Sequence, residues 1–233
     1  MNVTLKALGA LLTYPTPDLQ AAIDEIAEAI DAEARLPKRE KVALHELLAE
    51  LAAGDVLDLQ ECYVALFDRG RTTSLNLFEH VHGESRDRGP AMVDLMKVYT
   101  DAGFSLAANE LPDYLPVVLE FLSRQPSTEA DEMLSDCAHI VRNLGDELRR
   151  HGSRYDAVPA ALLAIIGETG LSVAFKDEVT TRSELRTASS LADEASIDED
   201  WMDAPVIFGP EGAPDCKPLR PAPTVIKFMP RQN

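Results

Sequence analysis

The chain has 233 residues, of which 45% are hydrophobic and 6% aromatic, and its formal net charge is −18. The apolar content is enough to bury a core, while the charge disfavours nucleic-acid phosphates as partners and favours basic peptides. The three cysteines are widely spaced and form no CxxC pair, so they support neither a disulfide framework nor a thiolate zinc site.

Apolar residues recur with a helical period through most of the chain up to about residue 170. A short leucine stripe lies within residues 5–12. Thr16 is placed to cap the next helix and Pro17 to occupy its first position. The apolar stripe of that helix continues to Ile30 at steps of three and four residues.

Two further helices are expected next. Pro37 opens a helix that is expected to stop near Gly54, and Asp58 is placed to cap a helix that continues to Phe67. Residues 68–89 are rich in polar side chains and predict a long loop.

The second half of the pattern predicts four further helices. One runs from Pro90 to about residue 103, and another begins after Asp113, which is placed to cap it. A long helix is expected over residues 127–148 and a last apolar one over residues 158–166. The period therefore predicts an all-α, bundle-like domain of about seven or eight helices over residues 1–176.

The remaining residues, 177–233, differ in composition. From Asp177 to Asp215 there are 11 acidic and 2 basic residues, a net charge of −9, and proline becomes frequent afterwards. This composition predicts a largely flexible, acidic tail. Two apolar islands, residues 201–208 and 225–228, either dock on the domain or contact a partner.

No segment of the chain reads as an export signal or a membrane-spanning run of about 20 apolar residues. A cytoplasmic location is therefore expected.

The predicted loop from Phe67 to Gly89 has a high density of charges that balance to zero. Arginine can hold a carboxylate with two parallel hydrogen bonds, so internal ion pairs that order the loop are expected. The alternative, which is compatible, is a polar pocket wall that meets a peptide. The charged residues are Asp68, Arg69, Arg71, Glu79, Glu84, Arg86, Asp87 and Arg88.

Within this loop, His80, His82 and Glu84 form an H-x-H-x-E pattern. On a strand these side chains would share one face and could bind a metal, as in a metal-dependent hydrolase. Hydrogen bonding of the two histidines within a loop explains the pattern as well, and we predict no metal site. The chain also has no G-x-S-x-G, no P-loop and no G-x-G-x-x-G motif.

A second polar unit is the turn Glu110-Leu-Pro-Asp113. Pro112 fixes a sharp entry into the following helix, and Asp113 could satisfy the free amides at its start. The functional interpretation makes the two carboxylates partners of an arginine-bearing ligand. The residues leave both interpretations open.

The run from Leu66 to Gly89, followed by Ala91-Met-Val-Asp-Leu95, closely resembles the signature of NarJ-type nitrate reductase assembly chaperones. The segment Leu12-Thr-Tyr14-Pro15, the turn from Glu110 to Asp113 and the tryptophan-containing residues 201–208 are similar to that family as well. The resemblance covers roughly residues 5–210.

The resemblance implies an all-helical maturation factor with no catalytic activity and no cofactor of its own. Its implied partner is the apo catalytic subunit of respiratory nitrate reductase, bound through a basic N-terminal leader. The chaperone is implied to keep this subunit competent for insertion of the molybdenum cofactor and iron–sulfur clusters before it docks at the membrane. Neither nucleic-acid binding nor membrane insertion is implied.

The client leader is expected to be a short, basic, amphipathic helix that lays its apolar face in a groove. Its cations would pair with acidic side chains. The acids expected in this role are Glu110 and Asp113, and the expected apolar walls are Tyr63, Phe67, Tyr114 and Phe121.

One position departs from the wider group of molybdenum-enzyme chaperones, which favours histidine after the Pro-Asp of the turn. Here the residue is Tyr114, which keeps a ring and a hydrogen-bonding tip but loses a charge change near neutral pH. Besides the hydrolase, a stable accessory subunit of a membrane enzyme remains an alternative.

Overall fold

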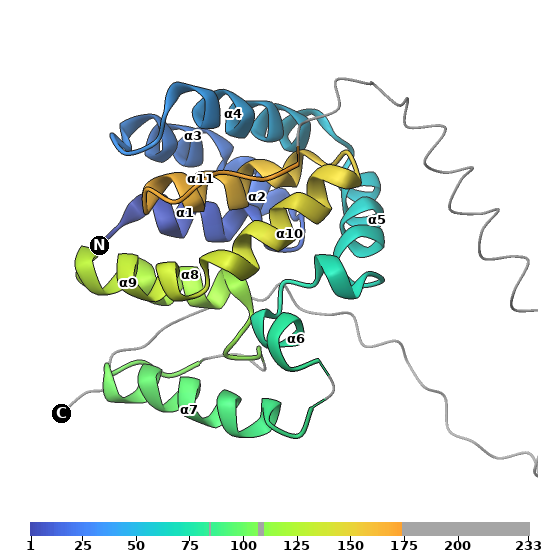
Figure 1. Cartoon of the computed structure of the whole chain (residues 1–233). Coiled ribbons are helices and arrows are strands. Elements are labelled where there is room, and N and C mark those ends of the chain that lie inside the picture. Colours follow the sequence, from blue (N-terminus) through green and yellow to red (C-terminus); the bar gives the residue numbers. More distant parts are fainter. Residues whose placement is uncertain (84, 107–109, 174–233) are drawn as a thin grey trace, which may run out of the picture. The chain divides into compact units, whose positions relative to one another are not determined.

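The computed structural model describes residues 1–83, 85–106 and 110–173 (Figure 1). Glu84 and the predicted tail, residues 177–233, lie outside the described residues, as does the predicted domain boundary at residue 176.

The described part of the chain folds into eleven α-helices and two 3-10 helices, and its only strand-like pairing is an isolated bridge between Asn76 and Tyr114. The all-α class is thus confirmed, and none of the described helices is long and apolar enough to cross a membrane. The elements are α1 (Val3–Leu11), α2 (Pro17–Ala21), α3 (Ile23–Ala32), α4 (Lys38–Ala53), α5 (Val56–Phe67), η1 (Arg71–Thr73), α6 (Leu77–His82), α7 (Arg88–Asp101), α8 (Leu115–Ser123), α9 (Ser127–Asp136), α10 (Ala138–Arg150), η2 (Arg154–Asp156) and α11 (Ala157–Ile165).

Helix α1 packs against α8, α3 and α11 and forms the centre of the core (Figure 1). Its leucine stripe, Leu5, Leu8 and Leu11, is fully buried, and burial of each side chain contributes about 1.5–3 kcal/mol. Gly9 lets α1 approach α8 closely, since a Cβ at this position would lie 3.2 Å from the Cβ of Leu119. The N-terminal stripe is therefore the element around which the other helices gather.

The helix count is higher than predicted because short breaks divide two of the predicted helices. These breaks do not interrupt the apolar period, so the sequence pattern does not reveal them. The stripe that ends at Ile30 is divided at Ala22 into α2 and α3, and the predicted long helix is divided at Cys137 into α9 and α10. The predicted loop over residues 68–89 contains η1, α6 and the start of α7. The predicted cap at Thr16 is confirmed, because its side chain accepts a hydrogen bond from the amide of Leu19 at 3.2 Å.

The start of α5 differs from the prediction. Asp55, not Asp58, is the capping residue, and its carboxylate accepts hydrogen bonds from the amides of Leu57 and Asp58 at 2.9 and 3.4 Å. Asp58 instead lies in the first turn, where a negative charge favours the helix dipole. Both acids fit a helix start in the sequence, and only the backbone shows which one precedes it.

Replacement of Asp55 by alanine is expected to lower the free energy of unfolding by about 1 kcal/mol, because two amides lose their acceptor. Asp58→Ala is the matched control and should change it by less than about 0.5 kcal/mol. Urea denaturation of the two variants measures both effects. Equal losses would contradict the assignment of the cap.

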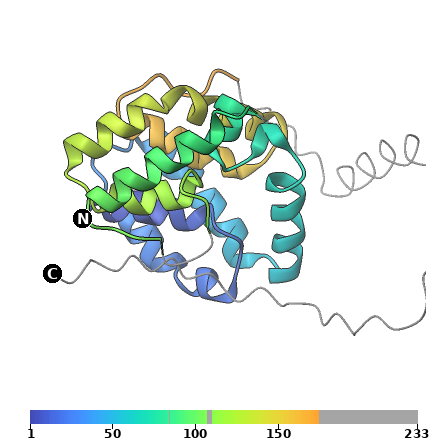
Figure 2. The same ribbon diagram turned by 90° about the horizontal axis from the view of Figure 1, so that it is seen from below.

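Helix α7 is the outermost helix at the bottom of Figure 1, and it lies in front of the others in Figure 2, which is seen from below. Its single buried residue is Tyr99, whose ring centroid lies 4.5 Å from that of Phe121. The Tyr99 hydroxyl donates a 2.7 Å hydrogen bond to the carbonyl of Pro112. Helix α7 is thus anchored near its end to the turn that leads into α8.

A buried ion pair joins α10 to η2. The Nε of Arg149 lies 2.6 Å from Oδ2 of Asp156, and the two side chains are 9% and 6% exposed. Arg149 also donates a 2.7 Å hydrogen bond to the carbonyl of Val173. This pair holds η2, and with it Tyr155, against the back of the candidate site.

Candidate functional site

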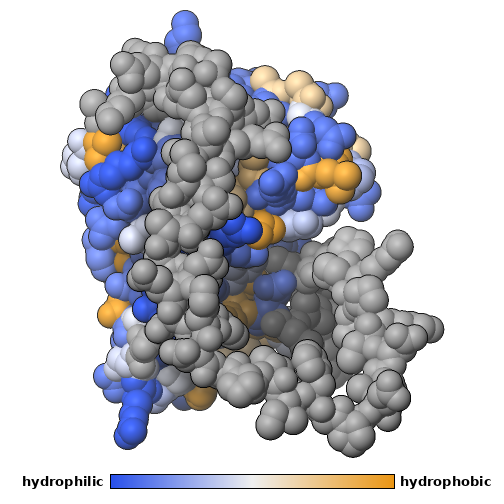
Figure 3. Space-filling view, turned by 90° about the vertical axis from the view of Figure 1, so that its right-hand side faces the viewer, coloured by the Kyte–Doolittle hydropathy of each residue, from blue (hydrophilic) through white to orange (hydrophobic). Residues whose placement is uncertain are grey.

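A pocket of about 350 Å³ opens where α5, the segment between η1 and α6, and the turn before α8 meet. The coloured part of the face on which α5 lies is mostly hydrophilic, with separate hydrophobic spots (Figure 3). The residues that line the pocket are Tyr14, Tyr63, Phe67, Asp68, Ser74, Leu75, Asn76, Glu110, Leu111 and Tyr114.

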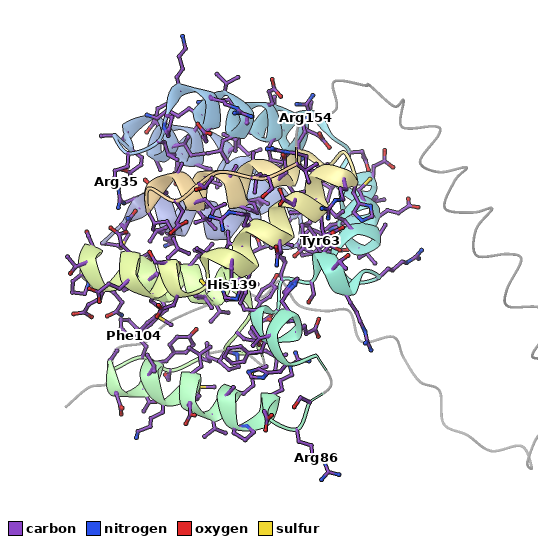
Figure 4. The ribbon with its side chains drawn as sticks, in the orientation of Figure 1. Arg35, Tyr63, Arg86, Phe104, His139 and Arg154 are labelled. Carbon is purple, nitrogen blue, oxygen red and sulfur yellow. The ribbon has the colours of Figure 1, made fainter. Side chains whose placement is uncertain are left out.

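The floor of the pocket is aromatic. The ring centroid of Phe67 lies 4.7 Å from that of Tyr63 and 5.2 Å from that of Tyr155, which packs behind them. Tyr14 adds an edge-on contact to Tyr63 at 5.6 Å and remains 44% exposed. Tyr63, labelled in Figure 4, is nearly buried on α5. Such packing fixes the rings and leaves an apolar surface for a ligand.

Two tyrosine hydroxyls meet at this floor. The hydroxyl of Tyr63 donates to the carbonyl of Leu12 at 2.8 Å and lies 3.1 Å from the hydroxyl of Tyr114. Burial raises the pKa of Tyr63 above its usual range and that of Tyr114 to about 12. Both phenols are therefore neutral at physiological pH, and Tyr114 contributes a hydrogen-bonding ring without a charge change.

Asp113 satisfies the start of α6 rather than that of its own helix. Its Oδ2 accepts a 3.0 Å hydrogen bond from the amide of Phe78, and its carbonyl accepts another from Leu77 at 3.0 Å. The predicted cap at the start of α8 is wrong, because the residue that precedes α8 is Tyr114 and no side chain caps this helix. The carboxyl of Asp113 thus holds the wall of the pocket that precedes α6.

The Asp113 carboxyl is also fully buried, and within the described part of the chain only one of its two oxygens accepts a hydrogen bond. Its residue exposure is 0%, and its Oδ1 has no hydrogen-bond partner among the described residues. Burial raises the pKa of this carboxyl, and the hydrogen bond from Phe78 and the positive charge of Arg88 oppose the shift. Burial prevents the side chain from reaching a ligand at the surface.

Two other carboxylates do line the pocket. Asp68 follows α5 and is exposed, while Glu110 begins the turn before α8 and is partly exposed. Together with the aromatic floor, they give the pocket the chemistry of a site for a cationic, partly apolar segment.

The predicted charged loop is partly ordered by its own side chains. Nη1 of Arg88 lies 3.2 Å from Oε1 of Glu79, which is an ion pair of the expected kind. Asp87 accepts a 3.1 Å hydrogen bond from the Ser85 hydroxyl. Arg86, labelled in Figure 4, points away from the helices. Arg69 and Arg71 are exposed at the start of this stretch.

The histidine pattern lies on a helix, so the strand geometry that a shared metal-binding face would need is not present at His80 and His82. His80 and His82 are in α6, where residues two apart do not share a face. Nε2 of His80 lies 2.8 Å from the carbonyl of Ser74, and the ring of His82 packs on Phe78. Among the described residues, which exclude Glu84, no group of three His, Cys, Asp or Glu side chains is placed to hold a metal ion.

Four of the six predicted client-contact residues meet at the pocket: Tyr63, Phe67, Glu110 and Tyr114. Phe121 does not, since it is 3% exposed and packs in the core against Tyr99 and Phe104.

Sequence reasoning did not assign Tyr14, Ser74, Leu75, Asn76 or Leu111 to the site. The signal for Tyr14 was its place in the family-like Leu12-Thr-Tyr14-Pro15 segment. The others come together through the bridge between Asn76 and Tyr114, which the helical period does not reveal.

Residues 16–157 match the family model of the nitrate reductase delta subunit. The NarJ protein of Escherichia coli strain K12, a nitrate reductase molybdenum cofactor assembly chaperone, is 43% identical over 212 residues, which cover 88% of this chain and 85% of that protein. NarW of the same strain, described as a probable chaperone of the same kind, is 38% identical over 213 residues, with 91% and 86% covered.

A solved structure shares the fold. It is described as a "putative redox enzyme maturation protein" from Archaeoglobus fulgidus, and it aligns with a TM-score of 0.51 at 21% identity, covering 70% of this chain and 91% of that one. The sequence matches and the helical architecture agree, and the chain belongs to the nitrate reductase delta subunit family, which includes the NarJ-type assembly chaperones.

Proposed function

We propose that this chain is a non-catalytic, system-specific chaperone for the assembly of a respiratory nitrate reductase. It binds the apo catalytic subunit in the cytoplasm and keeps it competent for molybdenum cofactor and iron–sulfur cluster insertion before membrane docking. The identities of 43% and 38% to proteins named for this task support the proposal. The supporting observation in the structure is a pocket that joins an aromatic floor to two carboxylates.

In this proposal the N-terminal leader of the catalytic subunit docks at the pocket as a short, basic, amphipathic segment. Tyr14, Phe67 and Tyr114 contact its apolar side chains, and Asp68 and Glu110 pair with its cations. The buried rings of Tyr63 and Tyr155 pack against Phe67 and hold it in place.

Two of the predicted contacts, Asp113 and Phe121, do not line the pocket and take supporting roles in this proposal. Through its bond to Phe78, Asp113 positions the start of α6 and the preceding residues 74–76, which line the pocket. Phe121 of α8 packs against Tyr99 of α7, whose hydroxyl bonds to the carbonyl of Pro112 in the turn that contributes Glu110 and Leu111 to the pocket.

Calorimetric titration of the chain with a synthetic peptide of the catalytic subunit's N-terminus tests the site. We expect one-to-one binding that weakens as salt increases, because exposed charge pairs are screened. The variant Asp68→Asn/Glu110→Gln should bind about tenfold more weakly at low salt, since two charge pairs contribute about 0.5–1 kcal/mol each.

The matched control is Asp58→Asn/Glu61→Gln, which removes two exposed acids of α5 that do not line the pocket. It should retain the affinity of the original chain. An equal loss in both variants would mean that the peptide responds to net charge only, and no binding at all would move the contact to another part of the client.

A stable accessory subunit is the second candidate, since the matching family model is described as a delta subunit. The two proposals differ in what copurifies with the chain. The chaperone is expected with the immature catalytic subunit alone, whereas an accessory subunit would stay with the mature, cofactor-loaded complex.

A further inference from the structure

The last residues of the chain have a composition opposite to that of the acidic stretch before them. No acidic residue follows Asp215. Residues 223–233, here called the C-terminal basic segment, combine two cations with a cluster of apolar side chains. The cations are Lys227 and Arg231, and the apolar residues are Val225, Ile226, Phe228 and Met229.

We propose that the C-terminal basic segment occupies the pocket when no client is bound and that the client leader must displace it. The inference rests on the proposed function, since it assigns an internal competitor to the same site. The chain would thus carry its own substitute for the leader and would shield its aromatic pocket before a client arrives.

The chemistry of the pocket matches this segment. Tyr14 and Leu111 line the pocket and are 44% and 45% exposed, so an apolar side chain such as Phe228 would remove apolar surface from water. Asp68 and Glu110 lie at the same pocket and provide partners for two cations.

Charge favours this segment over residues 177–215, and its larger number of apolar side chains distinguishes it from residues 216–222, which have the same net charge of +2. Residues 177–215 have a net charge of −9, from 11 acidic and 2 basic residues, and would be repelled by the two pocket carboxylates. The C-terminal basic segment has a net charge of +2 from its side chains. Its four large apolar side chains, Val225, Ile226, Phe228 and Met229, lie on both sides of Lys227 in the sequence.

The connection is long enough. Residues 174–222 lie between the described domain and the segment, and 49 residues span up to about 160 Å when extended. A domain of about 170 residues has a diameter of only about 40 Å. The segment can therefore reach the pocket from any point at which the chain leaves the domain.

Tethering makes a weak contact effective. An attached segment has an effective concentration on the order of 1 mM at its own site. If the free segment bound with a Kd of about 0.1 mM, it would weaken the apparent affinity for a leader about tenfold.

The test compares full-length chains in calorimetric titrations with the synthetic leader peptide. The variant Lys227→Gln/Phe228→Ser/Arg231→Gln removes both cations and the aromatic side chain of the segment. We expect it to bind the leader about tenfold more tightly than the original chain.

A matched control lies a few residues earlier. The variant Lys217→Gln/Leu219→Ser/Arg220→Gln also removes two cations and one large apolar side chain, but outside the segment, and it should leave the affinity for the leader unchanged. An equal gain in both triple variants would overturn the assignment to residues 223–233.

Other outcomes separate this inference from the proposed function. If the leader binds the original chain and the segment variant with the same Kd, the internal competitor is overturned and the leader site stands. If the leader binds neither, the proposed leader site fails, and a synthetic peptide of residues 223–233 decides the inference by direct titration of the segment variant.

That titration is followed by the NMR amide signals of Leu75, Asn76 and Leu111, which line the pocket. Saturable shifts at these residues support docking at the pocket, and unchanged signals overturn it. The molar mass measured by light scattering shows whether the segment that occupies the pocket comes from the same chain or from a second copy. A dimer that the segment variant cannot form would show that a second copy supplies it, contrary to the internal contact proposed.

Discussion

Replacement of Asp156 by alanine is expected to lower the free energy of unfolding by about 3–5 kcal/mol. The change leaves Arg149 buried without the carboxylate that lies 2.6 Å from its Nε, and removing one partner of a buried pair has a cost of this size. The remaining bond of Arg149 to the carbonyl of Val173 does not neutralise the charge. Urea denaturation followed by circular dichroism measures the loss.

The paired variant Arg149→Met/Asp156→Leu should recover most of this stability, because apolar side chains of similar volume can replace a buried ion pair. The exposed pair of Arg142 and Glu168 is the matched control, and Glu168→Ala should cost less than about 1 kcal/mol. A double variant as unstable as Asp156→Ala would refute the ion-pair explanation.

Replacement of Asp113 by alanine is expected to lower the free energy of unfolding by about 1–2 kcal/mol and the affinity for the leader at least tenfold. The change removes the acceptor for the Phe78 amide and loosens the start of α6 together with residues 74–76, which line the pocket. Asp113→Asn keeps an oxygen acceptor and should bind the leader nearly as well as the original chain. Loss of binding in the asparagine variant as well would show that the charge itself contacts the leader.

The dependence of stability on pH provides a second measurement at Asp113. Burial raises the pKa of its carboxyl in the folded state, so the folded state holds the proton more tightly than the unfolded one. Stability contributed by this group is therefore greatest below the unfolded pKa of about 3.9 and falls as pH rises toward the folded pKa. Asp113→Asn should flatten this part of the stability profile, and an unchanged profile would contradict the shift.

The sequence by itself determined the helical class, most of the helices and the family. Periodic apolar residues such as Leu5, Leu8 and Leu11 specify a buried helix face because side chains three and four apart lie on one side of a helix. Local capping is also readable when donor and acceptor are three residues apart, as Thr16 and Leu19 are.

Part of the candidate site could also be predicted from residues that are close in the sequence. Tyr63 and Phe67 are one helical turn apart on α5, so their shared face follows from the sequence, and Glu110 and Tyr114 belong to one short turn. These four residues were assigned to one site without knowledge of how α5 and the turn approach each other. Only the tertiary contacts place them at one pocket.

Tertiary structure alone decided the remaining roles. Asp113 has the sequence signature of a cap for the helix that follows it, but its carboxyl bonds to an amide 35 residues earlier, at Phe78. Phe121 was expected as an apolar wall of the pocket. It instead faces the core, where the ring of Tyr99 from α7 packs against it. Both outcomes depend on contacts between segments that are distant in the sequence. Such contacts can replace the local hydrogen bond or the side-chain exposure that the sequence pattern predicts.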